Sequence, residues 1–213
     1  MTARPLSESA GGGRFPGFDV MGQATHWDAA TAAVVEARLL APPPIRFFTA
    51  AEEGIARALF DQLLDQREEP RVPIVNMVDA RLVDGETDGW HYEGMPIDSQ
   101  SWQQSLAGLT ADCEAQFAVP FPEAGRESQR AVLRGIQNHD SSPWHGLDAG
   151  HVWNLWMRYA CTAFYSHPWA WEEIGFAGPS YPRGYKNLGV DRREPFEVAD
   201  AHPGLDPARE DRS

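Results

Sequence analysis

Long apolar runs are missing from this sequence. No stretch approaches the roughly 18 consecutive apolar residues that a membrane-spanning helix requires, so we expect no direct membrane span. Residues 1–13 contain one arginine, Arg4, in a polar, glycine-rich run without an apolar core. Secretory and twin-arginine signals both need more than that, so neither is expected here. The run itself is predicted to be disordered.

Basic residues and cysteines are also scarce. Lys and Arg number 18 against 31 Asp and Glu, which gives a formal net charge of −13. Nucleic acids and anionic membrane surfaces repel such a chain, so neither is an expected partner. The two cysteines, Cys113 and Cys161, lack CxxC spacing and cannot form a disulfide framework. We expect both to be small buried hydrophobic residues, and a disulfide, including one from Cys161 to a partner, is the alternative.

Alternation of apolar and polar residues with period two is nearly absent, which predicts an all-α fold. The 17 prolines and 19 glycines indicate long loops between the helices. We predict a single small helical domain over residues 25–189, with a flexible N-terminal arm at 1–24 and a polar C-terminal tail at 190–213. From Phe176 onward no periodicity is left, so the chain is expected to end in an extended, Gly/Pro-rich tail.

Capping signals and apolar spacing at i, i+3 and i+4 predict where the helices lie. A loop is expected between Gly85 and Pro96. The predicted helices run from Thr25 to about Leu40, Thr49 to Asp65, Pro73 to before Asp84, Asp98 to about Gly108, Glu127 to Asn138, Asp148 to Ser166, and Pro168 to Glu173.

The usual catalytic signatures are not found in the sequence. The glycines at 11–13 follow no strand and lead into no helix, which favours a linker over a phosphate loop, and no G-x-S-x-G motif occurs. A metal site is the more serious alternative, because histidines and acids gather between residues 139 and 173. Their spacing is not the helical i, i+3 or i, i+4 that aims two ligands at one ion, which favours capping, turn or surface roles. The group comprises His139, Asp140, His145, Asp148, His151, His167, Glu172 and Glu173.

Aromatic residues, in contrast, are concentrated toward the C-terminus. Eleven of the 23 lie between Trp144 and Tyr185, and five of the eight tryptophans lie between Trp144 and Trp171. A helix presents one stripe to its own core, so this set covers more faces than one small core needs. Large aromatics and arginine are the usual anchors of protein interfaces, which predicts a partner-binding surface here. Its candidate residues are Trp153, Trp156, Arg158, Tyr159, Phe164, Tyr165, His167, Trp169, Trp171, Tyr181, Arg183 and Tyr185.

The core is the alternative for part of this set. Aromatics at helical spacing are usually core residues, which applies to Trp156, Tyr159 and Phe164. Arg158 lies in the middle of the same helix, where a buried guanidinium needs carboxylate or carbonyl partners. An internal ion pair and a contact with a partner both satisfy that need. The aromatics beyond the last long helix are expected to face another chain.

The residues from Val152 onward resemble a known family. The sequence reads VWNLWMRYACTAFYSHPWAWEEIGF over 152–176 and GPSYPRGY over 178–185. This stretch is similar to the C-terminal signature of the gluconate 2-dehydrogenase subunit 3 family. The helix start at 47–49 and the segment at 73–75 also fit, so the resemblance spans residues 47–189.

The resemblance implies a non-catalytic small subunit that accompanies a large FAD-dependent dehydrogenase of the GMC type, acting on gluconate, glucose or related sugars and alcohols. FAD then belongs to the partner, no cofactor or catalytic residue is expected in this chain, and a cytochrome or another electron acceptor completes the complex. The lack of a dinucleotide fingerprint agrees with this. Two alternatives are a stand-alone metal-dependent enzyme using the 139–173 cluster and a folding or export escort. Members often carry a twin-arginine export signal, and none is expected in this chain. We therefore expect this protein in the cytoplasm, or in the periplasm if the partner carries the signal.

Overall fold

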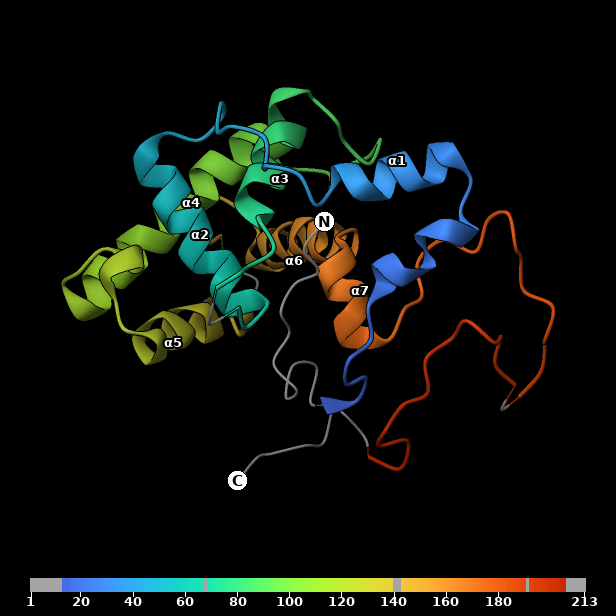
Figure 1. Cartoon of the computed structure of the whole chain (residues 1–213). Helices are drawn as coiled ribbons and strands as arrows, with labels where there is room; N and C mark the ends of the chain where they lie inside the picture. Colours follow the sequence, from blue (N-terminus) through green and yellow to red (C-terminus); the bar gives the residue numbers. More distant parts are fainter. Residues whose placement is uncertain (1–12, 67–68, 140–142, 191, 206–213) are drawn as a thin grey trace. The chain divides into compact units, whose positions relative to one another are not determined.

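The computed structural model of the chain describes residues 13–66, 69–139, 143–190 and 192–205. Within these ranges every regular element is a helix, apart from an isolated β-bridge between Trp144 and Leu147 (Figure 1). The predicted all-α fold class is confirmed. None of the described helices combines the length and the apolar composition needed to cross a membrane. Residues 1–12, where disorder is predicted, lie outside the described ranges.

The chain divides into two compact units. Unit 1 consists of residues 1–41 and 165–213, and unit 2 consists of residues 42–164. Unit 1 therefore draws on the predicted arm, on the predicted domain and on the predicted tail. The division into 1–24, 25–189 and 190–213 stays a prediction.

Unit 2 is built around one helix, α2, which contacts α3, α4, α5 and the short 3-10 helix η3. The capping box predicted at its start is confirmed, because Glu52 N–H donates to Thr49 Oγ1 at 3.3 Å and Thr49 N–H donates to Glu52 Oε2 at 2.8 Å. The helices of this unit are α2 (Ala50–Leu63), α3 (Ile74–Val83), α4 (Asp98–Phe117), η3 (Phe121–Glu123), α5 (Arg126–Gln137) and α6 (Ala149–Tyr165), whose last residue belongs to unit 1.

Helix α4 is longer than predicted. The prediction ended it at about Gly108, whereas the helix continues to Phe117. The rings of Trp144 and His145 explain the glycine, since a Cβ at position 108 would lie 2.8 Å from His145 Cδ2 and 3.0 Å from Trp144 Cη2. The glycine is a packing requirement and does not mark the end of the helix.

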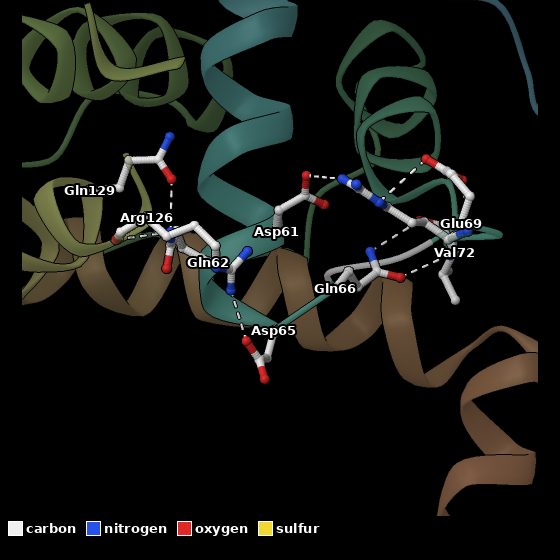
Figure 2. Close-up of polar contacts among 9 residues, drawn as sticks. Asp61, Gln62, Asp65, Gln66, Glu69, Val72, Arg126 and Gln129 are labelled. Carbon is white, nitrogen blue, oxygen red and sulfur yellow. Dashed lines mark hydrogen bonds and ion pairs between the residues drawn. The ribbon is translucent and has the colours of Figure 1, made fainter. Parts of the chain in front are cut away.

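Polar side chains on the last turns of α2 join it to two neighbours (Figure 2). On one side, Gln62 Nε2 donates to Gln129 Oε1 of α5 at 2.7 Å. On the other, Asp61 pairs with Arg71, and burial raises the pKa of that carboxyl while the arginine opposes the rise. Gln66 also accepts the Val72 N–H at 2.8 Å, so the segment leading into α3 is tied back to α2.

Unit 1 joins the two ends of the described chain. Its helices are η2 (Val20–His26), α1 (Ala29–Ala37) and α7 (Pro168–Ile174). Val20, Trp27, Val35 and Trp171 form its buried cluster. The Trp27 ring lies directly over Gly178, where a Cβ would be 2.6 Å from Trp27 Cζ2. A tryptophan of α7 is therefore packed in a core supplied largely by residues 20–35.

The predicted start of the first α-helix is wrong. Thr25 lies inside the 3-10 helix η2, and α1 begins only at Ala29. The true cap is Asp28, whose carboxylate accepts the Thr31 N–H at 2.8 Å. The Thr31 N–H is one of the amide donors that the first turn of a helix leaves without an intrahelical partner, and an Asp side chain accepts from it well.

Asp79 of α3 fixes the chain as it enters α2. It is completely buried, and its carboxylate accepts the backbone N–H groups of Arg46, Phe47 and Phe48 at 2.7, 2.8 and 2.9 Å. Hydrogen bonds to a charged acceptor contribute more than neutral ones, and amides deprived of the acceptor would be left unpaired inside the protein.

We predict that Asp79→Ala lowers the free energy of unfolding by at least about 3 kcal/mol, since three charge-assisted hydrogen bonds worth roughly 1.5–3 kcal/mol each are lost. Asp84→Ala is the matched control. It removes an acid of the next turn whose pair with Arg46 is largely exposed, and exposed pairs contribute about 0–1 kcal/mol. Urea unfolding followed by far-UV circular dichroism measures both. Equal losses in the two variants would contradict the assigned role of Asp79.

Candidate functional site

Two aromatic side chains of α6 point into the core of unit 2. Trp156 and Tyr159 are almost completely buried. Trp156 Nε1 donates to Ser105 Oγ at 3.0 Å, and the Tyr159 ring meets the Trp102 ring edge-on with centroids 5.6 Å apart. Ser105 and Trp102 both belong to α4. These two side chains hold α6 against α4, which is the core alternative that the sequence left open.

Tyr159 also carries a polar contact in this core. Its hydroxyl donates to Asp98 Oδ2 at 2.6 Å, at the first turn of α4. Burial, and then the hydrogen bond to the Asp98 carboxylate, raise the pKa of the Tyr159 phenol well above its usual value of 10. The phenol is therefore held in its neutral, donating form.

Arg158 lies between two aromatic rings. Its guanidinium is 4.9 Å from the Trp90 ring centroid and 5.4 Å from the Tyr159 ring centroid. It pairs with Asp88, and its Nη2 lies 3.6 Å from Asp98 Oδ2. Of the two roles considered for Arg158, the structure contains the internal ion pair.

The loop of residues 84–97 is fastened to unit 2 by the same group of side chains. Asp88 also pairs with Arg81 of α3, whose guanidinium lies 4.5 Å from the Tyr159 ring centroid. Tyr92 stacks on His151 of α6 with the ring centroids 3.8 Å apart and the planes 2° from parallel. The sequence predicts the loop, but it does not predict that the loop covers one end of α6.

The twelve predicted partner-binding residues differ in exposure. Trp156, Tyr159, Phe164, His167 and Trp171 are buried, Trp153, Arg158, Trp169 and Arg183 are partly buried, and Tyr165, Tyr181 and Tyr185 are exposed. A buried ring reaches a partner only by leaving its own core, which costs the apolar burial that holds it there. The exposed tyrosines already present their rings to solvent. The assignment of all twelve to a partner surface stays a prediction.

His167 has a local role. It is buried, it precedes α7, and its Nδ1 accepts the Trp169 N–H at 3.2 Å as a helix cap. Trp171 Nε1 donates to the carbonyl of Tyr165 and so closes the turn between α6 and α7 at 2.6 Å. His167 and Trp171, both predicted for the partner surface, thus fix the backbone between α6 and α7.

The histidines of the metal alternative take separate roles. His145 Nε2 lies 2.7 Å from Asp112 Oδ1 in a pair with α4, while His151 stacks on the loop tyrosine and His167 caps α7. In the described ranges no three His, Cys, Asp or Glu side chains gather closely enough to hold a metal ion. Asp140 lies outside those ranges.

Both cysteines are free thiols in the structure. Cys113 is buried, as expected for a small apolar residue, whereas Cys161 is only partly buried. Burial raises the pKa of each thiol, and Glu114 adds to the effect at Cys113. A raised pKa keeps both sulfurs protonated and weakly nucleophilic at neutral pH.

The C-terminal tail is organised by one buried acid and one stacked arginine. Glu194 accepts the backbone N–H groups of Lys186 and Asn187. Arg183 stacks on the Phe196 ring, with its guanidinium 3.8 Å from the ring centroid, and donates to Gln23 Oε1 at 2.8 Å. This stretch of the tail has no helix, yet side-chain contacts give it a defined path.

A groove that the sequence did not predict lies beside the end of α7. It has a volume of about 560 Å³ and is lined by Ile174, Phe176, Tyr185, Arg192, Arg193 and neighbours from the tail. The sequence signal for it is the adjacent pair of arginines at positions 192 and 193. Folding is needed to bring that pair next to α7.

Comparison with protein families places this fold. Residues 50–178, from α2 to just beyond α7, match the family of gluconate 2-dehydrogenase subunit 3. The chain belongs to this family. The matched region is shorter than the resemblance expected from the sequence, 47–189, so Tyr181, Arg183 and Tyr185 lie beyond it. No curated protein and no solved structure matches the chain.

The family region includes every helix of unit 2 and also α7 of unit 1. Residues 13–49 and the tail after Gly178 are outside it. The Trp171 side chain therefore belongs to the family region, whereas Val20, Trp27 and Val35 around it do not. The partner-facing candidates Tyr181 and Tyr185 are likewise features of this chain rather than of the matched region.

The raised pKa of Tyr159 predicts a loss of stability in alkali. Above pH 10 the unfolded chain releases the phenolic proton that the folded chain keeps, so the stability from Tyr159 is complete below pH 10 and declines above it. We expect Tyr159→Phe to cost about 1–2 kcal/mol at pH 8, through the lost hydrogen bond to Asp98, and the gap to wild type to narrow by pH 11. Urea unfolding at several pH values measures this. Tyr165→Phe, at an exposed ring, is the control, and a gap that stays constant with pH would contradict the prediction.

The contacts of Arg158 predict that it controls the loop of residues 84–97. Arg158→Met keeps an unbranched apolar side chain but removes the charge that pairs with Asp88 and stacks on Trp90. We expect hydrogen exchange of the loop amides to accelerate at least tenfold, as measured by mass spectrometry. Arg134→Met, at an exposed arginine of α5, should leave the loop unchanged. Equal exchange in both variants would show that other contacts hold the loop.

Proposed function

We propose that this protein is the small, non-catalytic subunit of a dehydrogenase complex, and that it binds and stabilises or matures a large FAD-dependent subunit of the GMC type. The large subunit would oxidise gluconate, glucose or a related sugar or alcohol, and would hold the FAD. A cytochrome or another acceptor would then take the electrons. Membership of the gluconate 2-dehydrogenase subunit 3 family is the observation that carries this proposal.

The surface of unit 1 supports a role in binding another protein. Tyr165, Ile174, Tyr181 and Tyr185 each leave about half or more of their surface exposed. Tyrosines are enriched at interface cores, where they bury a large area at a small cost in side-chain entropy. Several such residues in one small unit favour a surface that a partner covers.

The buried aromatics support the same proposal indirectly. Trp171 and its neighbours give unit 1 a core of its own, and the cap at His167 fixes where α7 begins. An interface built on such a preorganised frame loses less conformational entropy when it binds. In this proposal the exposed tyrosines make the contact, and the tryptophans of the predicted surface hold the frame. The expected cytoplasmic location stays a prediction.

We expect co-expression with the FAD-dependent GMC-type dehydrogenase of the same organism to give a stable complex. The purified large subunit should retain more FAD and more sugar-dependent activity with the small subunit than without it. Gel filtration, FAD absorbance and dye-linked activity measure these outcomes. A large subunit that is soluble, fully loaded with FAD and fully active alone, and that does not bind this chain, would overturn the proposal.

Variants identify the part of the surface that matters. Tyr165→Ala and Tyr181→Ala should each weaken the complex by about tenfold, because an interface ring that costs roughly 1.4 kcal/mol on truncation changes Kd by that factor. Phe117→Ala, at the exposed C-terminal end of α4, is the matched ring removal outside unit 1. If Phe117→Ala weakens binding and the tyrosine variants do not, the contact surface lies elsewhere.

A further inference from the structure

The groove beside α7 has an apolar floor formed by Ile174, Gly175 and Phe176. Close packing fixes the position of this floor. Gly175 ends α7 with φ 68°, and a Cβ at this position would lie 2.4 Å from Cε1 of Phe15. Glycine is required here on both grounds. The Phe176 ring of the floor meets the Trp171 ring edge-on, with centroids 5.4 Å apart. The floor is thus anchored in the core of unit 1.

The charges around the groove are unevenly satisfied. Asp200 accepts from Arg14 Nε at 3.0 Å and from the His202 N–H at 2.8 Å. Glu197 accepts the Glu194 N–H at 2.6 Å. The acids on the groove therefore already have donors.

Arg192 and Arg193 differ from these acids. Both side chains are exposed, and among the described residues neither guanidinium makes a hydrogen bond or an ion pair. Two neighbouring guanidinium groups that have no acceptor among the described residues, and that lie beside an apolar floor, favour an anionic group with an apolar neighbour. The preference is local, because the whole chain carries a net charge of −13 and repels acidic surfaces elsewhere.

The lining of the groove is open to solvent. Ile174 of the floor and Tyr185 both line the groove, and both remain 48% exposed. A small ligand is usually enclosed over most of its surface, whereas this lining would stay in contact with water around one. A segment of a larger protein covers the lining as it docks, so a polypeptide fits the groove better than a free metabolite does.

We propose that this groove binds an extended segment of the dehydrogenase partner in which an acidic residue lies beside a large apolar residue. This inference rests on the proposed function, since it names the part of the partner that docks here. The carboxylate of the segment pairs with Arg192 and Arg193, and its apolar side chain packs on Ile174 and Phe176. The pairing steers the encounter, so association is fastest at low salt.

Charge reversal tests the pairing. Purified small and large subunits are mixed, and Kd is measured by calorimetry in 50 and 300 mM NaCl. We expect R192E/R193E to weaken binding at least thirtyfold at 50 mM NaCl and to lose most of the salt dependence of wild type. R134E, at an exposed arginine of α5, is the control and should change Kd less than twofold. Arg192, Arg193 and Arg134 are all exposed and lie outside the hydrophobic cores. Circular dichroism is used to check that each variant is folded.

A second pair of variants tests the apolar floor. Ile174→Ser should weaken binding about tenfold, because it replaces an aliphatic contact with a hydroxyl. Leu188→Ser removes a more exposed leucine from the same tail, outside the groove, and should leave Kd within twofold of wild type. Equal effects of the two substitutions would overturn the role of the floor.

The sequence also permits direct identification of the docked segment. Lys186 is the only lysine, so the variant K186R/R193K has one side-chain amine, at the rim of the groove. Carbodiimide coupling of the complex joins this amine to a nearby carboxylate, and mass spectrometry identifies the peptide. We expect an acidic peptide of the large subunit that contains a large apolar residue.

The outcomes separate the two proposals. If the wild-type subunits form no complex, the proposed function fails and this inference fails with it. If the complex forms but R192E/R193E binds as tightly as R134E, or the amine couples only to Glu197 or Asp200 of its own chain, the inference alone is overturned. Weaker binding, lost salt dependence and an acidic cross-linked peptide together support it.

Discussion

The burial of Trp102 among rings from three other parts of the chain is the interaction on which unit 2 depends. Trp102 of α4 is completely buried and meets rings from three other parts of the unit, Phe48, Phe60 and Tyr159, at centroid distances of 6.1, 5.5 and 5.6 Å. Trp156 adds a hydrogen bond to the same helix. Aromatic burial of this size stabilises the fold, while edge-on geometry and paired polar atoms fix one arrangement of the helices. Trp156 and Tyr159 of α6 therefore serve first to pack the core of unit 2.

Buried carboxylates fix the conformation of several segments of this acidic chain. Asp79 binds three successive amides before α2, Asp98 accepts from Tyr159, and Glu194 binds the amides of the tail. Each acid offsets the cost of its burial by accepting hydrogen bonds. Several acids that contribute to the charge of −13 thus determine loop and tail conformation, while the rest solvate the surface.

The region that matches the family and the candidate partner surface overlap only in part. The matched region, 50–178, contains the α4–α6 contact and α7. The chain adds η2 and α1, which bury Trp171, and a tail that places Tyr185 and two arginines near the end of α7. In the proposed complex, part of the partner surface would lie outside the matched region, which is where discrimination between partners is expected to lie.

The amino-acid sequence by itself determined the all-α class, the capping box at Thr49, most helix boundaries and the family, because these depend on local spacing and on residue identity. It was wrong at one helix end for a tertiary reason and at one helix start for a local reason. At Gly108, which α4 passes through, the rings of Trp144 and His145 occupy the space of a side chain, whereas α1 begins at Ala29 because Asp28, and not Thr25, is its cap. Only the tertiary structure decided which aromatics are buried and that Arg192 and Arg193 meet α7, since exposure and long-range proximity are properties of the packed chain.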